Sequence, residues 1–247
     1  TKGIEFLFKK NNVTYVKGKG VLFSDNDVVV YEGEKKISYK AKNIVIATGS
    51  APTSLPGIEI DEEKIISSTG ALALKEVPKK FIVIGGGYIG LEMGSVWSRL
   101  GSEVTVLEYL DHITPGMDKE ISSEFLKILT KQGIKFKLNS KVTSVSNKDN
   151  QVEINFTNNQ TSKKENILAD KVLVSVGRKP YTEGLNLSKI GVKKDNKGRI
   201  EVNNKLQTSI KNIYAIGDVI KGPMLAHKAE EEGIAVAEII AGQAGHV

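Results

Sequence analysis

The glycines between residues 85 and 90 have the spacing that binds a dinucleotide. "FIVIGGGYIG" runs from Phe81 to Gly90 and contains the pattern G-x-G-x-x-G. In such a turn the first glycine permits the tight bend, the second lets the backbone approach a pyrophosphate, and the third lets a helix pack closely on a strand. The N–H groups and positive dipole end of that helix then face the phosphates. The spacing therefore predicts that a dinucleotide is bound by its pyrophosphate.

A carboxylate at Glu108 predicts which dinucleotide is preferred. Glu108 ends the apolar run 104–107, about 20 residues beyond the turn, where an acidic side chain accepts hydrogen bonds from the adenine ribose. A 2′-phosphate at this position would meet like charge, and residues 109–112 include no Arg or Lys to bind it. We therefore expect NAD to be preferred over NADP.

The elements around the turn predict an α/β fold. Residues 81–84 and 104–107 read as buried strands, and a helix is expected over 88–100, ending at Gly101. Further along, the pattern predicts a helix over 122–132, a strand over 135–138, a hairpin within 142–156 that turns at 147–150, and a buried strand over 171–176. Strands alternating with helices predict a Rossmann-like, doubly wound parallel sheet.

The flanking segments predict a second domain. Short strands over 13–16, 21–23, 28–31, 36–39 and 43–47 predict a small β-meander, and a linker is expected through Pro78. The runs "IVIATGS" (44–50) and "IYAIGDV" (213–219) each lead an apolar strand into a glycine, which fits either a nucleotide site or an ordinary strand end. A helix is expected over 227–241. Because these segments flank the dinucleotide module, we expect that module to be inserted into a second domain built from the outer segments, with domains over 1–75, 76–180 and 181–247.

Composition excludes several classes of chemistry. The chain has 247 residues, a net charge of +6, three histidines and no cysteine, so it contains no disulfide and no thiolate nucleophile. The histidines are scattered, and we expect no metal site. The excess of lysine fits either an anion-binding surface or a solvated one. Because the lysines alternate with acids and are not interleaved with aromatic residues, we expect neither nucleic acid nor membrane as a partner.

The motifs together resemble the two-dinucleotide flavoprotein disulfide reductases, and among them the dihydrolipoamide dehydrogenase family. The similarity covers nearly the whole chain, in the order "KNIVIATGS", "ISSTGALAL", "IGGGYIGLEMGSVWSRLG", "KQGIKFKLNSKV", "VSVGRKP", "NIYAIGD" and "GPMLAHKAEEEG". The last block favours the lipoamide enzymes over glutathione or mercuric reductases.

The resemblance implies that the outer segments form a partial FAD-binding domain, and it implies cofactor contacts in both domains. On the FAD side, Asp218 would bind the ribityl hydroxyls, although a turn carboxylate is the plainer interpretation of that residue alone. The segment 224–227 would pass the flavin ring, although His227 alone fits a helix cap or surface residue equally well. The remaining NAD contacts would be Glu92 near the nicotinamide, Val142 near the adenine and Gly177 along the cofactor backbone. The predicted cofactor residues are Gly85, Gly86, Gly87, Tyr88, Ile89, Gly90, Leu91, Glu92, Glu108, Val142 and Gly177 for NAD, and Gly20, Thr48, Gly49, Ser50, Asp218, Met224, Leu225, Ala226 and His227 for FAD.

The sequence departs from the family pattern where catalysis occurs. Such enzymes carry an FAD-binding glycine turn, a C-x-x-x-x-C redox pair and a His–Glu pair on a dimerisation domain, none of which this sequence contains. Neither His112 nor His246 is assigned a catalytic role. We therefore expect an internal fragment that keeps NAD binding, binds FAD weakly or not at all, and lacks lipoamide activity. The parent is expected to be a homodimer in the bacterial cytoplasm or mitochondrial matrix that oxidises the dihydrolipoyl groups of 2-oxoacid dehydrogenase complexes. A self-standing NAD-binding or regulatory module, and another NADH-dependent flavoprotein reductase, are the alternatives.

Overall fold

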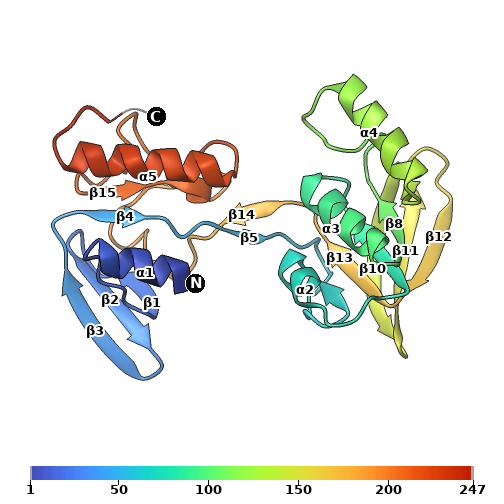
Figure 1. Cartoon of the computed structure of the whole chain (residues 1–247), viewed down its shortest axis with the longest axis horizontal. Helices are drawn as coiled ribbons and strands as arrows, with labels where there is room; N and C mark the ends of the chain where they lie inside the picture. Colours follow the sequence, from blue (N-terminus) through green and yellow to red (C-terminus); the bar gives the residue numbers. More distant parts are fainter. Residues whose placement is uncertain (1, 246–247) are drawn as a thin grey trace. The chain divides into compact units, whose positions relative to one another are not determined.

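The computed structural model describes residues 2–245, which form two compact units (Figure 1). Unit 2 spans 52–178, and unit 1 combines the described residues up to Ala51 with those from Lys179 onward. The expected insertion of one module into another is therefore confirmed. The chain passes between the compact units at residues 51/52 and 178/179. The boundaries of the cofactor-binding domains that the sequence predicted, near residues 75 and 180, stay predictions. Strands β5 (Ser50–Pro52) and β14 (Arg178–Pro180) pair where the chain passes from one unit to the other.

A five-stranded parallel sheet forms the centre of unit 2. Its strands are β6 (Ile65–Ile66), β7 (Lys80–Ile84), β8 (Glu103–Leu107), β9 (Lys135–Lys137) and β13 (Lys171–Val174), in the spatial order β6-β13-β7-β8-β9. Val83 of the central strand lies opposite Val106 on one side and Leu173 on the other. Both faces of the sheet are covered, which explains why β7 is an unbroken apolar run from Phe81 onward.

Helices cover one face of this sheet. They are α2 (Ser68–Ala73), α3 (Tyr88–Arg99) and α4 (Lys119–Lys131). Alternate strand residues, including Phe81 and Val83, pack against Leu91 and Trp97 of α3. The helix expected over 122–132 starts earlier because the Asp118 side chain accepts hydrogen bonds from the N–H groups of residues 120 and 121 and caps it.

An antiparallel sheet covers the opposite face, where a doubly wound fold would have helices. It consists of β10 (Ser140–Lys148), β11 (Gln151–Asn158) and β12 (Lys164–Ala169). Ile154 and Phe156 pack there against Ile82 and Val172 of the parallel sheet. The hairpin predicted within 142–156 is confirmed, with residues 149 and 150 at its tip, whereas β12 was not predicted. The α/β class is confirmed with this modification.

Unit 1 combines a meander, a short parallel pair and one long helix. The meander consists of β1 (Lys19–Leu22), β2 (Asp27–Glu32) and β3 (Lys35–Lys40). Strand β4 (Ile44–Ile46) pairs in parallel with β15 (Ile213–Ala215), which leads into the turn η1 (Gly217–Val219). Helix α5 (Ala226–Ile240) contributes Ala235 and Val236 to the core that contains β4 and β15.

Two local predictions were wrong, and one helix was missed. Residues Lys2–Lys10 form a helix, α1, that was not expected. The strand expected over 13–16 is absent from the described residues, because Val13 N–H closes the end of α1 on Phe8 C=O and Tyr15 lies 5.9 Å from the Phe8 ring. The expected linker through Pro78 contains β6 and α2. Short apolar segments are ambiguous in sequence, and β6 is defined by its parallel pairing with β13.

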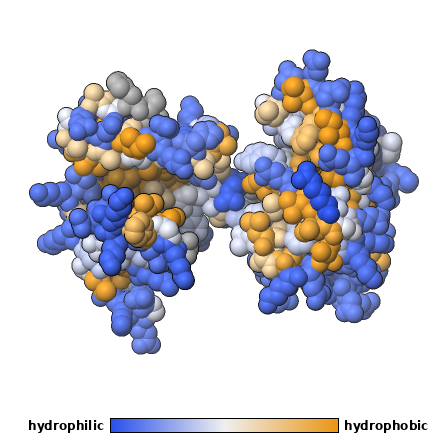
Figure 2. Space-filling view, viewed as in Figure 1, coloured by the Kyte–Doolittle hydropathy of each residue, from blue (hydrophilic) through white to orange (hydrophobic). Residues whose placement is uncertain are grey.

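The surface of unit 2 carries exposed apolar side chains over its helices. Figure 2 shows hydrophobic residues gathered over α2 and α3. Leu72 of α2, Val96 of α3 and Leu100 at the C-cap of α3 are exposed. No helix among residues 2–245 is long and apolar enough to cross a membrane.

Candidate functional site

Two glycines of the turn between β7 and α3 are required by the fold itself. A Cβ on Gly85 would lie 2.5 Å from Ser175 C=O, and the residue has φ +106°. A Cβ on Gly90 would lie 2.3 Å from Gly85 C=O and 2.5 Å from the Ser175 hydroxyl. These positions allow the tight bend and the close packing of α3 on the sheet, as the sequence predicted.

Gly87 differs because nothing in the protein requires it to be a glycine. Its φ is −76°, and a Cβ there would meet no atom within 4 Å. Gly87 is also the N-cap of α3, and its N–H group has no acceptor within residues 2–245. Free space beside unpaired N–H groups at a helix start suits a pyrophosphate. The described residues therefore fit a dinucleotide at this turn.

The Glu108 carboxylate lies directly beside the turn. It is buried, and its two oxygens accept hydrogen bonds from Gly86 N–H at 2.5 Å and Leu110 N–H at 2.8 Å. Each carboxylate oxygen can accept further bonds, so a ribose hydroxyl can still be bound. Sequence reasoning gave Glu108 only a role toward the ligand. The structure shows that it also holds the glycine turn.

The other predicted NAD residues lie around this edge of unit 2. Gly177 follows β13, the parallel neighbour of β7, so both strands end at the same edge of the sheet, and its C=O accepts a hydrogen bond from Thr53 N–H at 3.0 Å. Val142 lies opposite Phe156 in the antiparallel sheet and packs partly buried in the core between the sheets. The remaining predicted residues lie on the first turns of α3: Tyr88, Ile89, Leu91 and Glu92.

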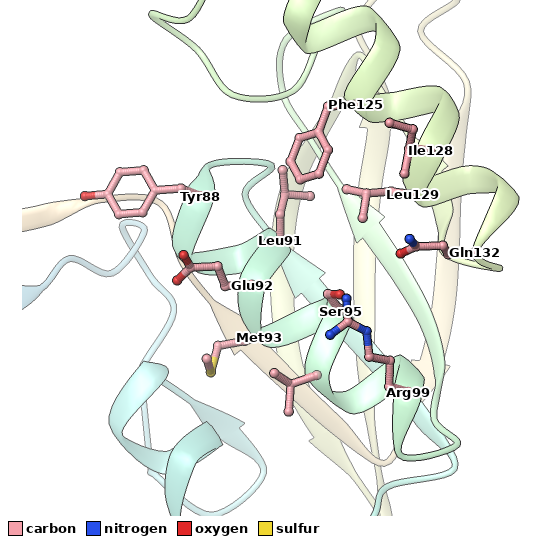
Figure 3. Close-up of a pocket in the computed structure, with 11 residues that line it drawn as sticks. Tyr88, Leu91, Glu92, Met93, Ser95, Arg99, Phe125, Ile128, Leu129 and Gln132 are labelled. Atoms are coloured by element: carbon pink, nitrogen blue, oxygen red, sulfur yellow. The ribbon is translucent and has the colours of Figure 1, made fainter.

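A groove of about 550 Å³ opens between α3 and α4 (Figure 3). Tyr88 and Glu92 lie near the start of α3, and Arg99 lies toward its other end. The lining is mainly apolar, with Phe125 and Leu129 contributed by α4. The groove includes three predicted cofactor residues, Tyr88, Leu91 and Glu92, but not the glycines of the turn.

The predicted flavin residues of unit 1 meet at the ends of β4 and β15. The Ser50 hydroxyl donates a hydrogen bond to the Asp218 carboxylate at 2.5 Å. The Thr48 hydroxyl donates to Tyr181 C=O at 2.6 Å, and Tyr181 N–H donates to Gly49 C=O at 2.9 Å. The structure thus brings Ser50 and Asp218, both predicted on the FAD side, into contact at the ends of two paired parallel strands.

The start of α5 follows the turn that carries Asp218. Leu225 is the N-cap, and Ala226 and His227 form the exposed first turn, preceded by the half-buried Met224. The N–H groups of such a helix start are free to face an anionic or polar ligand. Gly20 lies apart from this group, on β1 of the meander.

The sequence did not predict a buried ion pair, formed by Lys228 and Glu232, that contacts the backbone of Gly217. Glu232 of α5 accepts a hydrogen bond from Gly217 N–H at 2.7 Å and pairs with Lys228 at 2.7 Å. Lys228 also donates to Gly217 C=O at 3.3 Å. The spacing of four residues between Lys228 and Glu232 predicts a helical pair, but the same spacing is common on exposed helix faces, so it could not indicate burial.

The histidines show no catalytic arrangement within the described residues. His112 Nδ1 lies 2.6 Å from the exposed Asp111 carboxylate, and this hydrogen bond lowers the pKa of Asp111. No group of three His, Asp or Glu side chains within residues 2–245 could hold a metal ion. His246 lies outside the described residues.

Comparison with known proteins agrees with this geometry. The family model for pyridine nucleotide-disulphide oxidoreductases matches residues 1–233. The chain belongs to this family. The resemblance seen in the sequence is thereby confirmed, because the matched residues include both strand–glycine runs and the dinucleotide turn.

The relatives also show what this sequence covers. The whole chain aligns with the mitochondrial dihydrolipoyl dehydrogenase of Pisum sativum at 57% identity and covers 50% of that protein's length. It aligns with the leghemoglobin reductase of Glycine max at 56% identity and covers 47% of that protein's length. The HOCl-induced flavoprotein disulfide reductase RclA of Escherichia coli matches 98% of the chain with a TM-score of 0.86 and 28% identity, over 56% of that structure. The chain therefore spans about half the length of the curated relatives that it matches.

Proposed function

We propose that unit 2 is an NAD-binding module and that the Gly85–Gly90 turn holds the cofactor's pyrophosphate. The open space at Gly87 carries this proposal, because a glycine with an ordinary φ and no close neighbour is explained by a ligand that approaches the backbone. The free N–H groups at the start of α3 would bind the phosphate oxygens. Glu108 would accept hydrogen bonds from the adenine ribose.

The same carboxylate supports a preference for NAD over NADP. Glu108 is held by two backbone N–H groups, so it cannot swing away from a 2′-phosphate without breaking them. A phosphate placed there would meet a buried negative charge that forms no ion pair within residues 2–245. Val142, Gly177 and Glu92 are proposed to complete the cofactor contacts along the same edge of unit 2.

Unit 1 is proposed to supply part of an FAD site. Asp218, oriented by Ser50, would bind ribityl hydroxyls, and the first turn of α5 would face the flavin. FAD, when bound, would supply the electron acceptor between thiols and NAD. The residues of this chain would bind and orient that cofactor, with Thr48, Gly49 and Gly20 on its FAD side.

The proposed whole protein is a dihydrolipoyl dehydrogenase that oxidises protein-bound dihydrolipoyl groups and reduces NAD. The 57% identity to the pea enzyme supports this assignment, and the mitochondrial location of that relative supports a location in the mitochondrial matrix. A homodimer is proposed for the whole protein. Because the 247 residues contain no cysteine, they are proposed to be inactive toward dihydrolipoamide by themselves. They are proposed to bind FAD weakly or not at all because they contain no second G-x-G-x-x-G turn for the FAD pyrophosphate.

A second candidate is an NADH-dependent reductase that acts on another acceptor. The similarity to leghemoglobin reductase favours this candidate, since that relative is nearly as similar as the pea enzyme. Turnover of dihydrolipoamide and of ferric leghemoglobin by the whole protein would separate the two.

Titration of the 247-residue chain with NADH and with NADPH tests the proposed NAD site. We expect saturable binding of NADH. Its affinity should be at least about tenfold higher than that of NADPH, because the 2′-phosphate would meet the Glu108 carboxylate. A tenfold difference in affinity corresponds to about 1.4 kcal/mol. No binding of NADH, or equal binding of both cofactors, would contradict the proposal.

A further inference from the structure

Thr114 adopts a backbone conformation that its residue type disfavours. Its φ is +49°, in the left-handed region, although it is β-branched and precedes Pro115. Side chains branched at Cβ rarely occur there, and a following proline restricts the backbone further. Such strain persists only where surrounding contacts impose it, and it occurs frequently at ligand sites.

The contacts that hold Thr114 connect it to the dinucleotide turn. Thr114 N–H donates a hydrogen bond to Gly86 C=O at 2.8 Å. Its hydroxyl shares a 2.7 Å hydrogen bond with the hydroxyl of Ser122, a buried residue in the first turns of α4. The neighbouring Ile113 is fully buried and would lie 3.2 Å from a Cβ on Gly86. The loop between β8 and α4 is therefore fastened to the glycine turn at Gly86.

This fastening fixes the direction of the next N–H group. Gly86 C=O and Gly87 N–H belong to one peptide unit, and in a planar trans peptide they point to opposite sides. Thr114 holds the C=O on one side, so Gly87 N–H must point to the other. Glu108 holds the preceding N–H, that of Gly86. Gly86 is thus held through both its N–H group and its C=O group before any ligand arrives.

We propose that Thr114 is a positioning residue for the cofactor's pyrophosphate. It acts through Gly86 by orienting the Gly87 N–H group toward the phosphate oxygens, and its strained conformation is maintained by the Ser122 hydroxyl and the burial of Ile113. This proposal rests on the proposed NAD site and assigns a role to a loop residue outside the glycine motif.

The test compares three variants of the 247-residue chain by NADH titration. Thr114→Gly keeps the N–H group and accepts φ +49° without strain, so it should bind NADH within about threefold of the unchanged chain. Thr114→Val keeps the N–H group but loses the Ser122 contact, and its affinity should fall between the other two. Thr114→Pro removes the N–H group and forbids the conformation, so it should lose about tenfold in affinity, the scale of one hydrogen bond.

Two readouts separate positioning from a general effect on folding. The loss in Thr114→Pro should appear with NADH and with ADP-ribose but not with adenosine, which has no phosphate. Protection of the Gly87 amide from hydrogen exchange by NADH should decrease in Thr114→Val and Thr114→Pro. If Thr114→Pro does not fold, Thr114→Val tests the positioning role instead, through its affinities for NADH, ADP-ribose and adenosine and through hydrogen exchange of the Gly87 amide.

Asp149 offers a matched control. It has φ +53° in the same unit, at the tip of the β10–β11 hairpin, where its C=O accepts a hydrogen bond from Lys64. Asp149→Pro should leave NADH affinity unchanged. Equal losses in the two proline variants, or full affinity in Thr114→Pro, would overturn the positioning role while leaving the NAD site intact. An unchanged chain that binds no NADH would instead overturn the proposed function, and the positioning role with it.

Discussion

The buried carboxylate of Glu232 accepts a hydrogen bond from the backbone N–H of Gly217 at 2.7 Å. Its partner Lys228 donates to the C=O of the same glycine, so one helical ion pair holds both polar groups of Gly217. The next residue, Asp218, accepts a hydrogen bond from Ser50. The ends of β4 and β15 are thereby joined to α5 through a short chain of polar contacts.

Glu232→Ala should destabilise unit 1 by about 3 kcal/mol, because Lys228 and Gly217 N–H would lose their buried partner. The loss should appear in chemical denaturation and as faster amide hydrogen exchange in β4 and β15. Glu231→Ala is the matched control, since Glu231 is exposed on the same helix and should have little effect. Equal effects of the two substitutions would show that the buried pair contributes no specific stability.

Gly90→Ala and Gly87→Ala should separate folding from binding. The methyl group at 90 would overlap Gly85 C=O and should lower stability by about 2 kcal/mol, in the range for overpacking. The methyl group at 87 enters open space, so stability should fall by no more than about 1 kcal/mol, the cost of alanine in place of glycine at a helix N-cap. NADH affinity should nevertheless fall in Gly87→Ala. The fluorescence of Trp97, the chain's one tryptophan, reports unfolding of unit 2. Unchanged NADH binding in Gly87→Ala would argue against a pyrophosphate at this position.

Glu108→Ala should lower NADH affinity and reduce discrimination against NADPH. The substitution removes the ribose acceptor, the charge that opposes a 2′-phosphate and the bond to Gly86 N–H. We expect about a tenfold loss for NADH, corresponding to about 1.4 kcal/mol, with a smaller loss for NADPH. The ratio of the two dissociation constants is the measurement. An unchanged ratio would mean that Glu108 does not select the cofactor.

The dinucleotide turn could be predicted from sequence because its signals are local. Strand, glycine spacing, helix and terminal carboxylate all lie within Phe81–Glu108, and the structure contains the first three in that order, with Glu108 directly after β8. The contact between Ser50 and Asp218 could also be expected, since parallel strands end at one edge of a sheet.

Long-range contacts could not be predicted. Nothing in the residues around Thr114 indicates that its N–H group binds Gly86, because that contact depends on how the loop returns across the sheet. The burial of Glu232 depends in the same way on the packing of α5. Strand β12 has a mixed pattern of exposure and was missed because its pairing with β11 defines it.

The stability of unit 2 should depend on the ionisation of Asp61 in mildly acidic solution. Burial acts to raise the pKa of Asp61, but hydrogen bonds from the N–H groups of residues 63, 65 and 64 act together in the other direction, and the pKa lies below its ordinary value. A lowered folded pKa adds stability that is present above the unfolded value of about 3.9 and is lost as the pH falls through the folded pKa.

Asp61→Asn retains a side-chain oxygen but removes the charge. The variant should therefore be less stable than the unchanged chain at pH 6, and the difference should shrink as the pH falls below about 4. Urea denaturation followed by Trp97 fluorescence at several pH values measures this difference. A difference that stays constant from pH 6 to 3 would show that the Asp61 charge is not the source of the stability, and that the three N–H groups are bound equally well by a neutral oxygen.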